Sequence, residues 1–530
     1  MKRIHALAAV GAVALSLSAF ADAPAVVPAP REMKVGVGSF ARAGRNLVGY
    51  SPDAPGAGAA AAEFANAFGG RVAPRVGGCS VTFSAAAEKL PAEGYLLSVT
   101  PREVAVRASD GAGFFYAVQT LRQLSAGTDA LEGRLPTAFP CVEIKDYPRY
   151  PWRGVHIDDC RHFFGVGAVK HVIDQMAFHK LNTLHWHLTD DQGWRLAIDK
   201  YPELVKYGAT RPESPDYHDR DKGDGRPYGP FFYTRSEVRQ IVTYAKLRHV
   251  EIVPEIELPG HARAALAAYP ALSCVGESLS PRTPWTRWGI SADIFCGGNP
   301  DVYRFLEDVL DEVCEMFPSK VVHIGGDEAK KDRWKQCPKC QARIKELGLK
   351  NEAELQTWLT KHFVDYLAGK GRRAIGWDEI LEGGMPSGAM VMSWRGTKGG
   401  EAAAAAGHDV VMTPTSHCYF DFPQGLADDP HVYANWTKAA PTLESVYRFD
   451  PCQGIAAADR PHVLGAQCNN WAETTLDEKE LMWKLWPRAS ALAEALWTAA
   501  PERDFADFLR RMTVHRERLV RSGVNCAPLK

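Results

Sequence analysis

The segment 323–328 reads His-Ile-Gly-Gly-Asp-Glu and places two carboxylates directly after two glycines. A carboxylic acid can protonate a leaving group, and its ionised form can activate water or stabilise a developing cation. Glycines let the backbone approach a ligand closely because they carry no side chain. Asp327 and Glu328 are therefore candidate catalytic residues, and the simpler alternative is an ordinary charged loop.

Polar and aromatic residues also follow each of the other seven predicted strands. They are Asp158 with Arg161 and His162, the segments 185–191 and 255–261, Trp377 with Asp378 and Glu379, Trp394 with Arg395, the segment 419–421, and the segment 471–473. In a barrel of parallel strands, the carboxyl ends of all strands meet at one mouth, where active sites lie. Eight such clusters at one face are hard to explain by core packing, so we expect them to form one site.

The elements that must position these residues alternate between strand and helix from Trp152 onward. The predicted strands are 154–158, 183–190, 251–258, 321–327, 374–379, 390–394, 410–414 and 463–471, and helices are expected at 166–180, 236–248, 301–316 and 353–369. This alternation predicts a parallel α/β fold, and eight strands are what a closed (β/α)8 TIM barrel needs. An open doubly wound sheet is the alternative, but no glycine-rich phosphate loop follows the first strand.

The chain before the barrel has a different pattern. Short β-like runs at 94–99 and 104–106 and an amphipathic helix at 113–124 predict a small α+β domain. We expect a signal peptide at 1–21, the α+β domain at 22–147 and the catalytic (β/α)8 domain at 148–505. Residues 506–530 are expected to form a helical tail that packs on the barrel.

The first 21 residues have the pattern of a cleavable signal peptide. Lys2 and Arg3 precede an apolar stretch at 6–21, which ends in Ala-Phe-Ala before Asp22. The apolar stretch is shorter than the roughly 20 residues of a membrane span, and no second stretch follows. We therefore expect an exported protein without a membrane span, either periplasmic or extracellular.

Composition excludes some partners and favours others. The 530 residues carry a formal net charge of −1, so no basic surface for nucleic acid is indicated. The sequence contains 14 Trp and 17 Tyr, and although most are expected in the core, aromatic faces suit neutral sugars. The oligomeric state is left open.

The twelve cysteines give a weaker signal. Cys274 and Cys296 bracket a loop and are the best candidates for a disulfide in an exported protein. Cys337 and Cys340 form the one CxxC motif, and a zinc ribbon would need a second such pair. The sequence therefore favours a local disulfide or free thiols there, and no metal.

Carboxylates beside Trp and Tyr, without a coherent set of metal ligands, indicate a glycosidase pocket. Adjacent side chains of an extended segment point to opposite faces. Asp327 and Glu328 would then not form the facing carboxylate pair of an ordinary retaining glycosidase, and the reaction would need another nucleophile.

The segment 323–328 resembles the HxGGDE signature of glycoside hydrolase family 20, the β-N-acetylhexosaminidases. The resemblance covers nearly the whole mature chain, since further family motifs follow in order at 113–124, 158–162, 185–191, 254–261, 377, 394, 419–421 and 471–473. Any single motif is moderately specific, whereas the ordered set is highly specific. No catalytic position departs from the family's pattern.

The resemblance implies an enzyme that releases terminal β-linked GlcNAc or GalNAc by substrate-assisted catalysis, through an oxazolinium ion formed by the substrate's own acetamide. It makes Glu328 the general acid and base, Asp327 the partner of the acetamide N–H, and Tyr419 the partner of the acetamide oxygen. Asp190 and His261 are expected to tune the pKa of Glu328. The implied substrate-binding residues are Arg161, Asp421 and Glu473 for the hydroxyls, and Trp377, Trp394 and Trp471 for the acetyl pocket and ring. No cofactor is implied.

Other functions stay open at this point. An ordinary retaining β-glycosidase would use Glu473 as its nucleophile, and a disaccharide-releasing relative such as a lacto-N-biosidase would share the motifs. A non-catalytic glycan-binding protein is a third alternative. A metal-dependent amidohydrolase would use His185 and His187 with His261 and His323 as ligands. Linkage and epimer preference are not indicated by the sequence.

Overall fold

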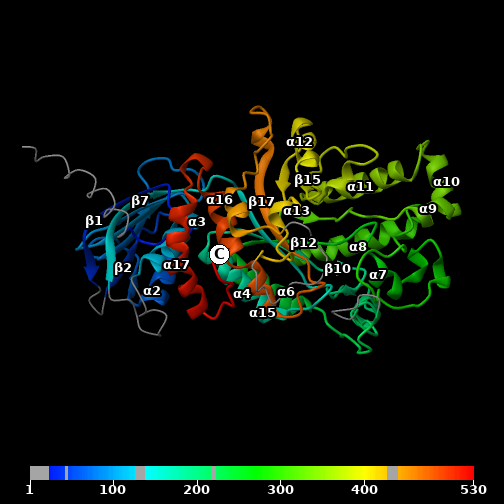
Figure 1. Ribbon diagram of the computed structural model, residues 1–530, viewed down its shortest axis with the longest axis horizontal. Coiled ribbons are helices and arrows are strands. Elements are labelled where there is room, and N and C mark those ends of the chain that lie inside the picture. The colour runs from blue at the N-terminus through cyan, green and yellow to red at the C-terminus, as the bar shows by residue number, and fades with distance from the viewer. Residues whose placement is uncertain (1–22, 42–45, 126–137, 216–221, 426–439, 530) are drawn as a thin grey trace, which may run out of the picture. The chain divides into compact units, whose positions relative to one another are not determined.

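The computed structural model describes residues 23–41, 46–125, 138–215, 222–425 and 440–529 (Figure 1). They form two compact units, one of residues up to Tyr147 with Ala506–Ser522, and one of Pro148–Phe505 with the last residues from Gly523. The division follows Tyr147 and lies next to Pro148 and Pro151. The predicted signal peptide at 1–21 lies outside the described residues.

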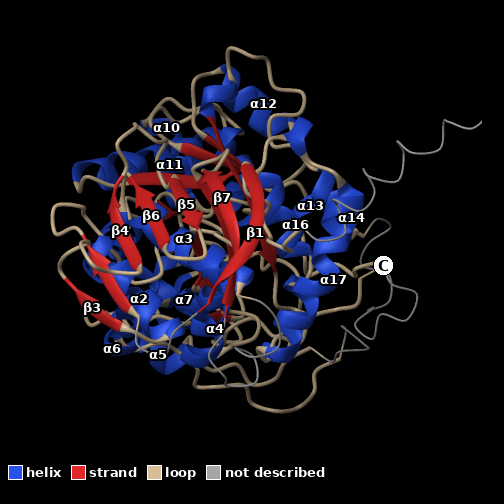
Figure 2. Cartoon of the chain, turned by 90° about the vertical axis from the view of Figure 1, so that its left-hand side faces the viewer, coloured by secondary structure: helices blue, strands red, loops and turns tan. Residues whose placement is uncertain are grey.

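The described part of the first unit contains a seven-stranded mixed sheet in the order β1-β7-β5-β6-β4-β2-β3, and Figure 2 shows most of these strands side by side. The strands are β1 Glu32–Ala41, β2 Leu47–Tyr50, β3 Arg71–Ala73, β4 Val81–Ala85, β5 Tyr95–Val99, β6 Val104–Ala108 and β7 Ala138–Asp146. Helices α2 (Ala57–Phe68) and α3 (Gly111–Leu124) contact each other and the sheet. The predicted α+β domain is confirmed.

The C-terminal helix α17 (Phe505–Arg521) corrects one expectation. Residues Ala506–Ser522 belong to the first unit, whereas the residues from Gly523 belong to the barrel unit, so the expected tail is divided between the two units. Arginines of α17 donate to backbone carbonyls near the start of the described chain: Arg510 to Ala23 at 3.1 Å, Arg511 to Val26 at 2.8 Å and Arg518 to Ala25 at 2.6 Å. These contacts cannot be recognised in a sequence, because every residue has a backbone carbonyl that can accept a hydrogen bond.

The second unit is a closed barrel of eight strands, hydrogen-bonded in chain order and all parallel. The strands are β8 Trp152–Asp158, β9 Thr183–His187, β12 Glu251–Glu255, β13 Val321–His323, β14 Arg373–Trp377, β15 Met390–Ser393, β16 Val410–Met412 and β17 Val463–Asn470. The predicted TIM barrel is confirmed. Strands β12 and β13 end earlier than expected, because the residues that follow them turn into the loops of the mouth.

The helices of the second unit follow the predicted alternation. They are α4 Gly165–Phe178, α5 Glu203–Tyr207, α6 Arg235–Lys246, α7 Arg263–Ala268, α8 Pro300–Met316, α9 Asp332–Gln336, α10 Pro338–Glu346, α11 Glu352–Gly369, α12 Lys398–Ala405, α13 Thr415–Cys418, α14 Leu443–Arg448, α15 Glu478–Leu485 and α16 Arg488–Trp497. A short ribbon of β10 (Thr189–Asp190) and β11 (Gly193–Trp194) follows β9. No helix among the described residues is long and apolar enough to cross a membrane.

Helix α8 shows how the sequence sets these boundaries. The Asn299 side chain accepts a hydrogen bond from the Asp301 N–H, and Pro300 occupies the first helical position, where no N–H is needed. Apolar residues at helical spacing, including Val302, Leu306 and Val309, are buried. The helix thus lays one face against the barrel and leaves its acidic face to solvent.

The predicted disulfide between Cys274 and Cys296 is wrong. Neither residue forms a disulfide in the structure, and neither do Cys337 and Cys340. The sulfurs of all four cysteines gather in one place, although the two pairs lie far apart in the sequence.

Candidate active site

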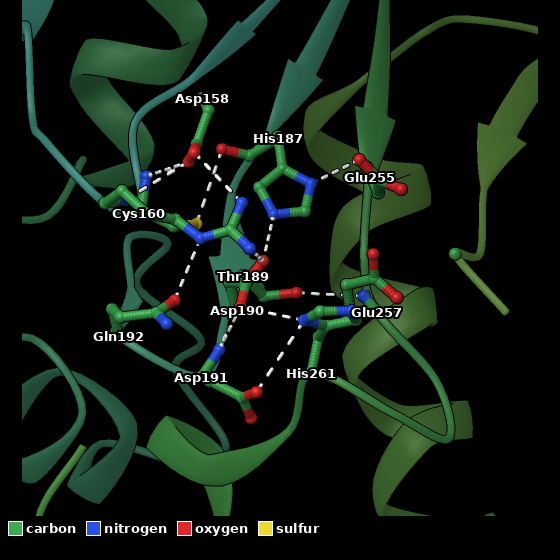
Figure 3. Close-up of polar contacts among 12 residues, drawn as sticks. Asp158, Cys160, His187, Thr189, Asp190, Asp191, Gln192, Glu255, Glu257 and His261 are labelled. Carbon is green, nitrogen blue, oxygen red and sulfur yellow. Dashed lines mark hydrogen bonds and ion pairs between the residues drawn. The ribbon is translucent and has the colours of Figure 1, made fainter. Parts of the chain in front are cut away.

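Asp190 is the centre of a buried network beyond the carboxyl end of β9 (Figure 3). Its Oδ2 accepts a hydrogen bond from Nε2 of His187 at 2.8 Å and pairs with Nη2 of Arg161 at 2.9 Å. Its Oδ1 lies 3.1 Å from Nδ1 of His261. Asp190 therefore joins the segments that follow three consecutive strands of the barrel, β8, β9 and β12.

His261 continues this network to the two neighbouring carboxylates. Its Nε2 lies 3.6 Å from Oδ2 of Asp327 and also 3.6 Å from Oε2 of Glu328. The Asp327 side chain is 10% exposed and that of Glu328 is 36% exposed. One carboxylate is thus held inside the site, while the other is open to a ligand.

The backbone around Asp327 and Glu328, which carry the two carboxylates, makes a turn. The angle φ is +61° at Gly325, +103° at Gly326 and +49° at Glu328. A Cβ atom on Gly325 would lie 1.8 Å from Oε2 of Glu257, so a larger residue would collide there. The expectation of an extended segment with opposed side chains is wrong, because the turn brings both carboxylates to the same nitrogen of His261.

Opposite charges keep this network ionised. Burial alone would raise the pKa of Asp190, but Arg161 and His261 hold it well below its usual range. Burial alone would lower the pKa of His261, but Asp190 and Asp327 raise it well above its usual value. Burial raises the pKa of Asp327 to about 6, although the nearby His261 opposes this. At neutral pH an imidazolium therefore lies between carboxylates.

The predicted aromatic wall consists of Trp377, Trp394 and Trp471. The Trp471 ring is 5.8 Å from the Trp377 ring, and Trp394 stacks on Tyr419 with centroids 6.0 Å apart. Trp394 and Trp471 are partly exposed, whereas Trp377 is 1% exposed. Trp377 therefore lies at the base of the wall, below the two tryptophans that a ligand can touch.

The polar side chains near the wall are those of Tyr419, Asp421, Glu473 and Arg161. Burial raises the pKa of Tyr419 well above its usual value, although a hydrogen bond with Trp471 opposes this, so Tyr419 stays a neutral phenol. Burial and the nearby Glu473 raise the pKa of Asp421 to about 7. Oε1 of Glu473 lies 4.0 Å from Nη2 of Arg161, and the Arg161 guanidinium lies over the Trp471 ring. Contacts link the predicted site residues into one group, which Asp421 joins through its charge interaction with Glu473.

Glu255, to which the sequence assigned no role, is the centre of a second buried network. Its Oε1 lies 2.8 Å from Nδ1 of His323 and accepts from Nε1 of Trp377 at 2.9 Å. Its Oε2 lies 3.1 Å from Nε2 of His185 and accepts from His187. Three of the four histidines considered as metal ligands thus surround a carboxylate, and the alternation of polar residues along β9 was the signal for it.

Asp158 and Asp191 both bind backbone N–H groups. Asp158 accepts from the backbone N–H groups of Cys160 at 2.8 Å and Ala472 at 3.0 Å. Asp191 accepts from the N–H groups of Arg263 at 3.0 Å and Ser291 at 2.9 Å. Their oxygens fix loops beneath the site.

Family profiles match both units of the chain. The profile of the glycosyl hydrolase family 20 catalytic domain matches residues 150–500, and that of domain 2 of the same family matches residues 23–147. The chain belongs to glycosyl hydrolase family 20. Family 20 membership agrees with the barrel, the preceding α+β domain and the ordered motifs at the mouth.

Two relatives in family 20 differ in how much of their length is matched. A β-hexosaminidase of Porphyromonas gingivalis is 46% identical over 440 residues, which is 82% of this chain and 55% of that protein. A β-hexosaminidase of Akkermansia muciniphila is 35% identical over 81% of this chain and 84% of that protein. The chain therefore spans about half of the first relative and most of the second.

Solved structures of family 20 share the whole architecture. The exo β-N-acetylglucosaminidase of Vibrio harveyi, in complex with N-acetylglucosamine, has a TM-score of 0.85 at 31% identity, over 95% of this chain and 78% of that one. The N-acetyl-β-hexosaminidase of Streptomyces plicatus, in complex with Thio-NAglucal, has a TM-score of 0.82 at 29% identity, over 96% of this chain and 97% of that one.

Proposed function

We propose that this family 20 chain is an exo-acting, retaining β-N-acetylhexosaminidase that releases terminal β-linked GlcNAc or GalNAc by substrate-assisted catalysis. The observation that carries the proposal is the placement of Asp327 and Glu328 at equal distance from one His261 nitrogen, one buried and one open. Neighbouring carboxylates of different exposure suit different tasks, since one can stabilise charge while the other exchanges protons.

Glu328 is proposed as the general acid and base. Its partly exposed carboxyl protonates the glycosidic oxygen as the bond to the anomeric carbon breaks, and later accepts a proton from the attacking water. His261 and Asp190 act as positioning residues, because they hold a positive charge beside this carboxyl without facing the mouth themselves. Two successive displacements at the anomeric carbon leave the β configuration unchanged.

Asp327 and Tyr419 are proposed to hold the reacting acetamide. The acetamide oxygen attacks the anomeric carbon and closes a ring that carries positive charge on its N–H group. The buried carboxylate of Asp327 accepts from that N–H and stabilises the charge. Tyr419, a neutral phenol at neutral pH, donates to the acetamide oxygen and aligns it.

The remaining residues are proposed to bind the sugar. Trp394 and Trp471 present partly exposed faces to the ring and acetyl group, above Trp377. Arg161 lies beside Glu473, so a cation and a carboxylate are available to the hydroxyls. Oδ1 of Asp421 has no hydrogen-bond partner among the described residues and is a free acceptor.

The relatives support this proposal. Both relatives are named β-hexosaminidase, and the Vibrio harveyi structure holds N-acetylglucosamine. A ligand related to the expected product therefore fits the same architecture. An ordinary two-carboxylate glycosidase, with Glu473 as nucleophile, is not favoured by these relatives.

The deciding experiment compares two aryl glycosides, the p-nitrophenyl β-N-acetylglucosaminide and the β-glucoside, which differ at the 2-position. Substrate assistance predicts turnover of the first and almost none of the second. The Glu328→Gln variant should lose the activity on the first by roughly 10²–10⁴-fold. Equal turnover of both glycosides would contradict the proposal and favour Glu473 as nucleophile.

We also propose that the protein is exported to the periplasm or the medium after removal of residues 1–21. The support is the charged, apolar and small-residue pattern of this segment in the sequence. Sequencing the N-terminus of the protein recovered from each cell fraction tests this. A mature chain that starts at Asp22 is expected, and retention of Met1 would contradict it.

A further inference from the structure

Four cysteines from two separate loops meet in the barrel unit. Cys274 and Cys296 lie between helices α7 and α8, and Cys337 and Cys340 flank the start of α10. Their sulfur atoms all lie within 4.8 Å of one another. The Sγ of Cys340 is 3.8 Å from that of Cys274 and 3.6 Å from that of Cys296, which is itself 3.6 Å from that of Cys337.

These separations match four ligands around a common centre. A tetrahedral zinc ion with Zn–S bonds of about 2.3 Å sets its sulfurs about 3.8 Å apart. A disulfide would instead bring two sulfurs to about 2.05 Å and leave the other pair apart. Here Cys296 and Cys340 each have two sulfur neighbours at similar distance, which pairwise bonding does not produce.

The backbone around the sulfurs is shaped for this cluster. Ser273 and Phe295 form a β-bridge, which brings Cys274 and Cys296 side by side. A Cβ on Gly298 would lie 2.2 Å from the Lys339 carbonyl oxygen, so glycine allows this segment to pack on the Cys337–Cys340 turn.

We propose that Cys274, Cys296, Cys337 and Cys340 bind one structural zinc ion. Four protein ligands leave no open position for a substrate, and soft thiolates select zinc over harder cations. Cys296, Cys337 and Cys340 are buried, so the ion is shielded from solvent. The single CxxC seemed insufficient in the sequence because the second pair is separated by 21 intervening residues.

The zinc ion joins the loops that follow strands β12 and β13. The first loop carries His261 and the second carries Glu328. Asp293 pairs with Arg263 of the first loop and accepts from Nε of Arg333 in the second at 3.0 Å. The zinc site therefore fastens the two loops at their outer ends, and its role is to position the catalytic residues.

The test begins with metal analysis of the full-length purified protein by inductively coupled plasma mass spectrometry. About one zinc per chain is expected, with all cysteines alkylated as thiols after denaturation. A metal-free protein with these four cysteines linked in disulfides would overturn the proposal. Metal-free protein with four free thiols, or iron in place of zinc, would overturn it as well.

Variants locate the site. Cys274→Ser removes the half-exposed ligand, and zinc release to a chromogenic chelator should become at least about tenfold faster. Cys314→Ser, which alters a half-buried cysteine outside the cluster, is the matched control and should keep wild-type release. Equal release from both variants would contradict the assignment.

Cobalt substitution covers the case in which the serine variant fails to fold. Wild-type protein produced with Co²⁺ should show the intense absorption of a tetrahedral tetrathiolate site, with sulfur-to-cobalt charge-transfer bands. A spectrum typical of octahedral oxygen or nitrogen ligands, or no bound cobalt, would exclude a four-cysteine site. This readout is independent of any glycosidase activity.

Discussion

The two acidic centres of the barrel, around Glu255 and around Asp327, differ in how their oxygens are paired. Each oxygen of Glu255 has two nitrogen neighbours, from three histidines and Trp377. Oδ1 of Asp327 has no hydrogen-bond partner among the described residues. Glu255 thus has no acceptor left for a ligand, whereas Asp327 keeps one.

This difference indicates that Glu255 positions neighbouring residues, whereas Asp327 takes part in the reaction. An unpaired buried polar atom costs roughly 1–3 kcal/mol, which a substrate N–H can recover on binding. The fully surrounded Glu255 instead fixes His187, which in turn holds Asp190. Within one barrel, the fully hydrogen-bonded carboxylate of Glu255 sets the geometry, and the carboxylate of Asp327, which has an unpaired oxygen, binds the substrate.

The largest expected effect on rate is at Glu328. Glu328→Gln should lower kcat on N-acetylglucosaminides by roughly 10²–10⁴-fold, because the amide can neither give nor take the proton. Its stability should stay within about 0.5 kcal/mol of wild type, since the side chain is partly exposed. Steady-state kinetics and urea unfolding check both values. A large loss of stability would mean that Glu328, like Glu255, holds its neighbours in place.

The opposite pattern is expected at Glu255. Glu255→Leu leaves several buried nitrogens without their carboxylate and should lower the unfolding free energy by about 3–5 kcal/mol. Urea unfolding against wild type and Glu328→Gln measures the contrast. If Glu255→Leu unfolds at the wild-type urea concentration, the distinction between the two centres is wrong.

Asp327→Asn should have a smaller effect on rate than Glu328→Gln. The amide keeps the shape but cannot neutralise the charge on the acetamide ring, so kcat/KM should fall by roughly 10²–10³-fold. Kinetics on the p-nitrophenyl N-acetylglucosaminide measure it. A change below about threefold would mean that Asp327 does not meet the developing charge.

The smallest expected effect is on the pH profile. Because the pKa of Asp327 is raised to about 6, its carboxylate is present above this pH and is lost as the pH falls below it. The value of kcat/KM should therefore decline on the acid side of about pH 6. Asp327→Asn should flatten this limb, while Asp421→Asn, the control for another raised carboxyl, should keep it. An unchanged limb in Asp327→Asn would assign it to another group.

The sequence predicted the barrel because each strand is a short buried run followed by polar residues, and each helix has an apolar face. The membership of Asp190, His261 and Glu473 in one site followed from the same rule, since parallel strands end at one mouth. The positions of these residues along the chain were sufficient, without any knowledge of contacts.

What the sequence missed depends on the backbone and on non-local partners. The turn at Gly325–Gly326 reverses the direction of Asp327 relative to an extended chain, and it is set by φ values that a motif does not state. The role of Glu255 requires nitrogens from three other strands. The association of α17 with residues 23–26 rests on carbonyl groups, which every sequence provides.

The position of α17 has a consequence for the order in which the protein can fold. The backbone of Val27 exchanges two hydrogen bonds with Gln123, and Arg511 of α17 binds the carbonyl of the preceding residue. The N-terminal unit therefore lacks one of its helices until α17, which follows the whole barrel in the sequence, has been synthesised. The barrel sequence between them must be fully synthesised before the N-terminal domain can be completed.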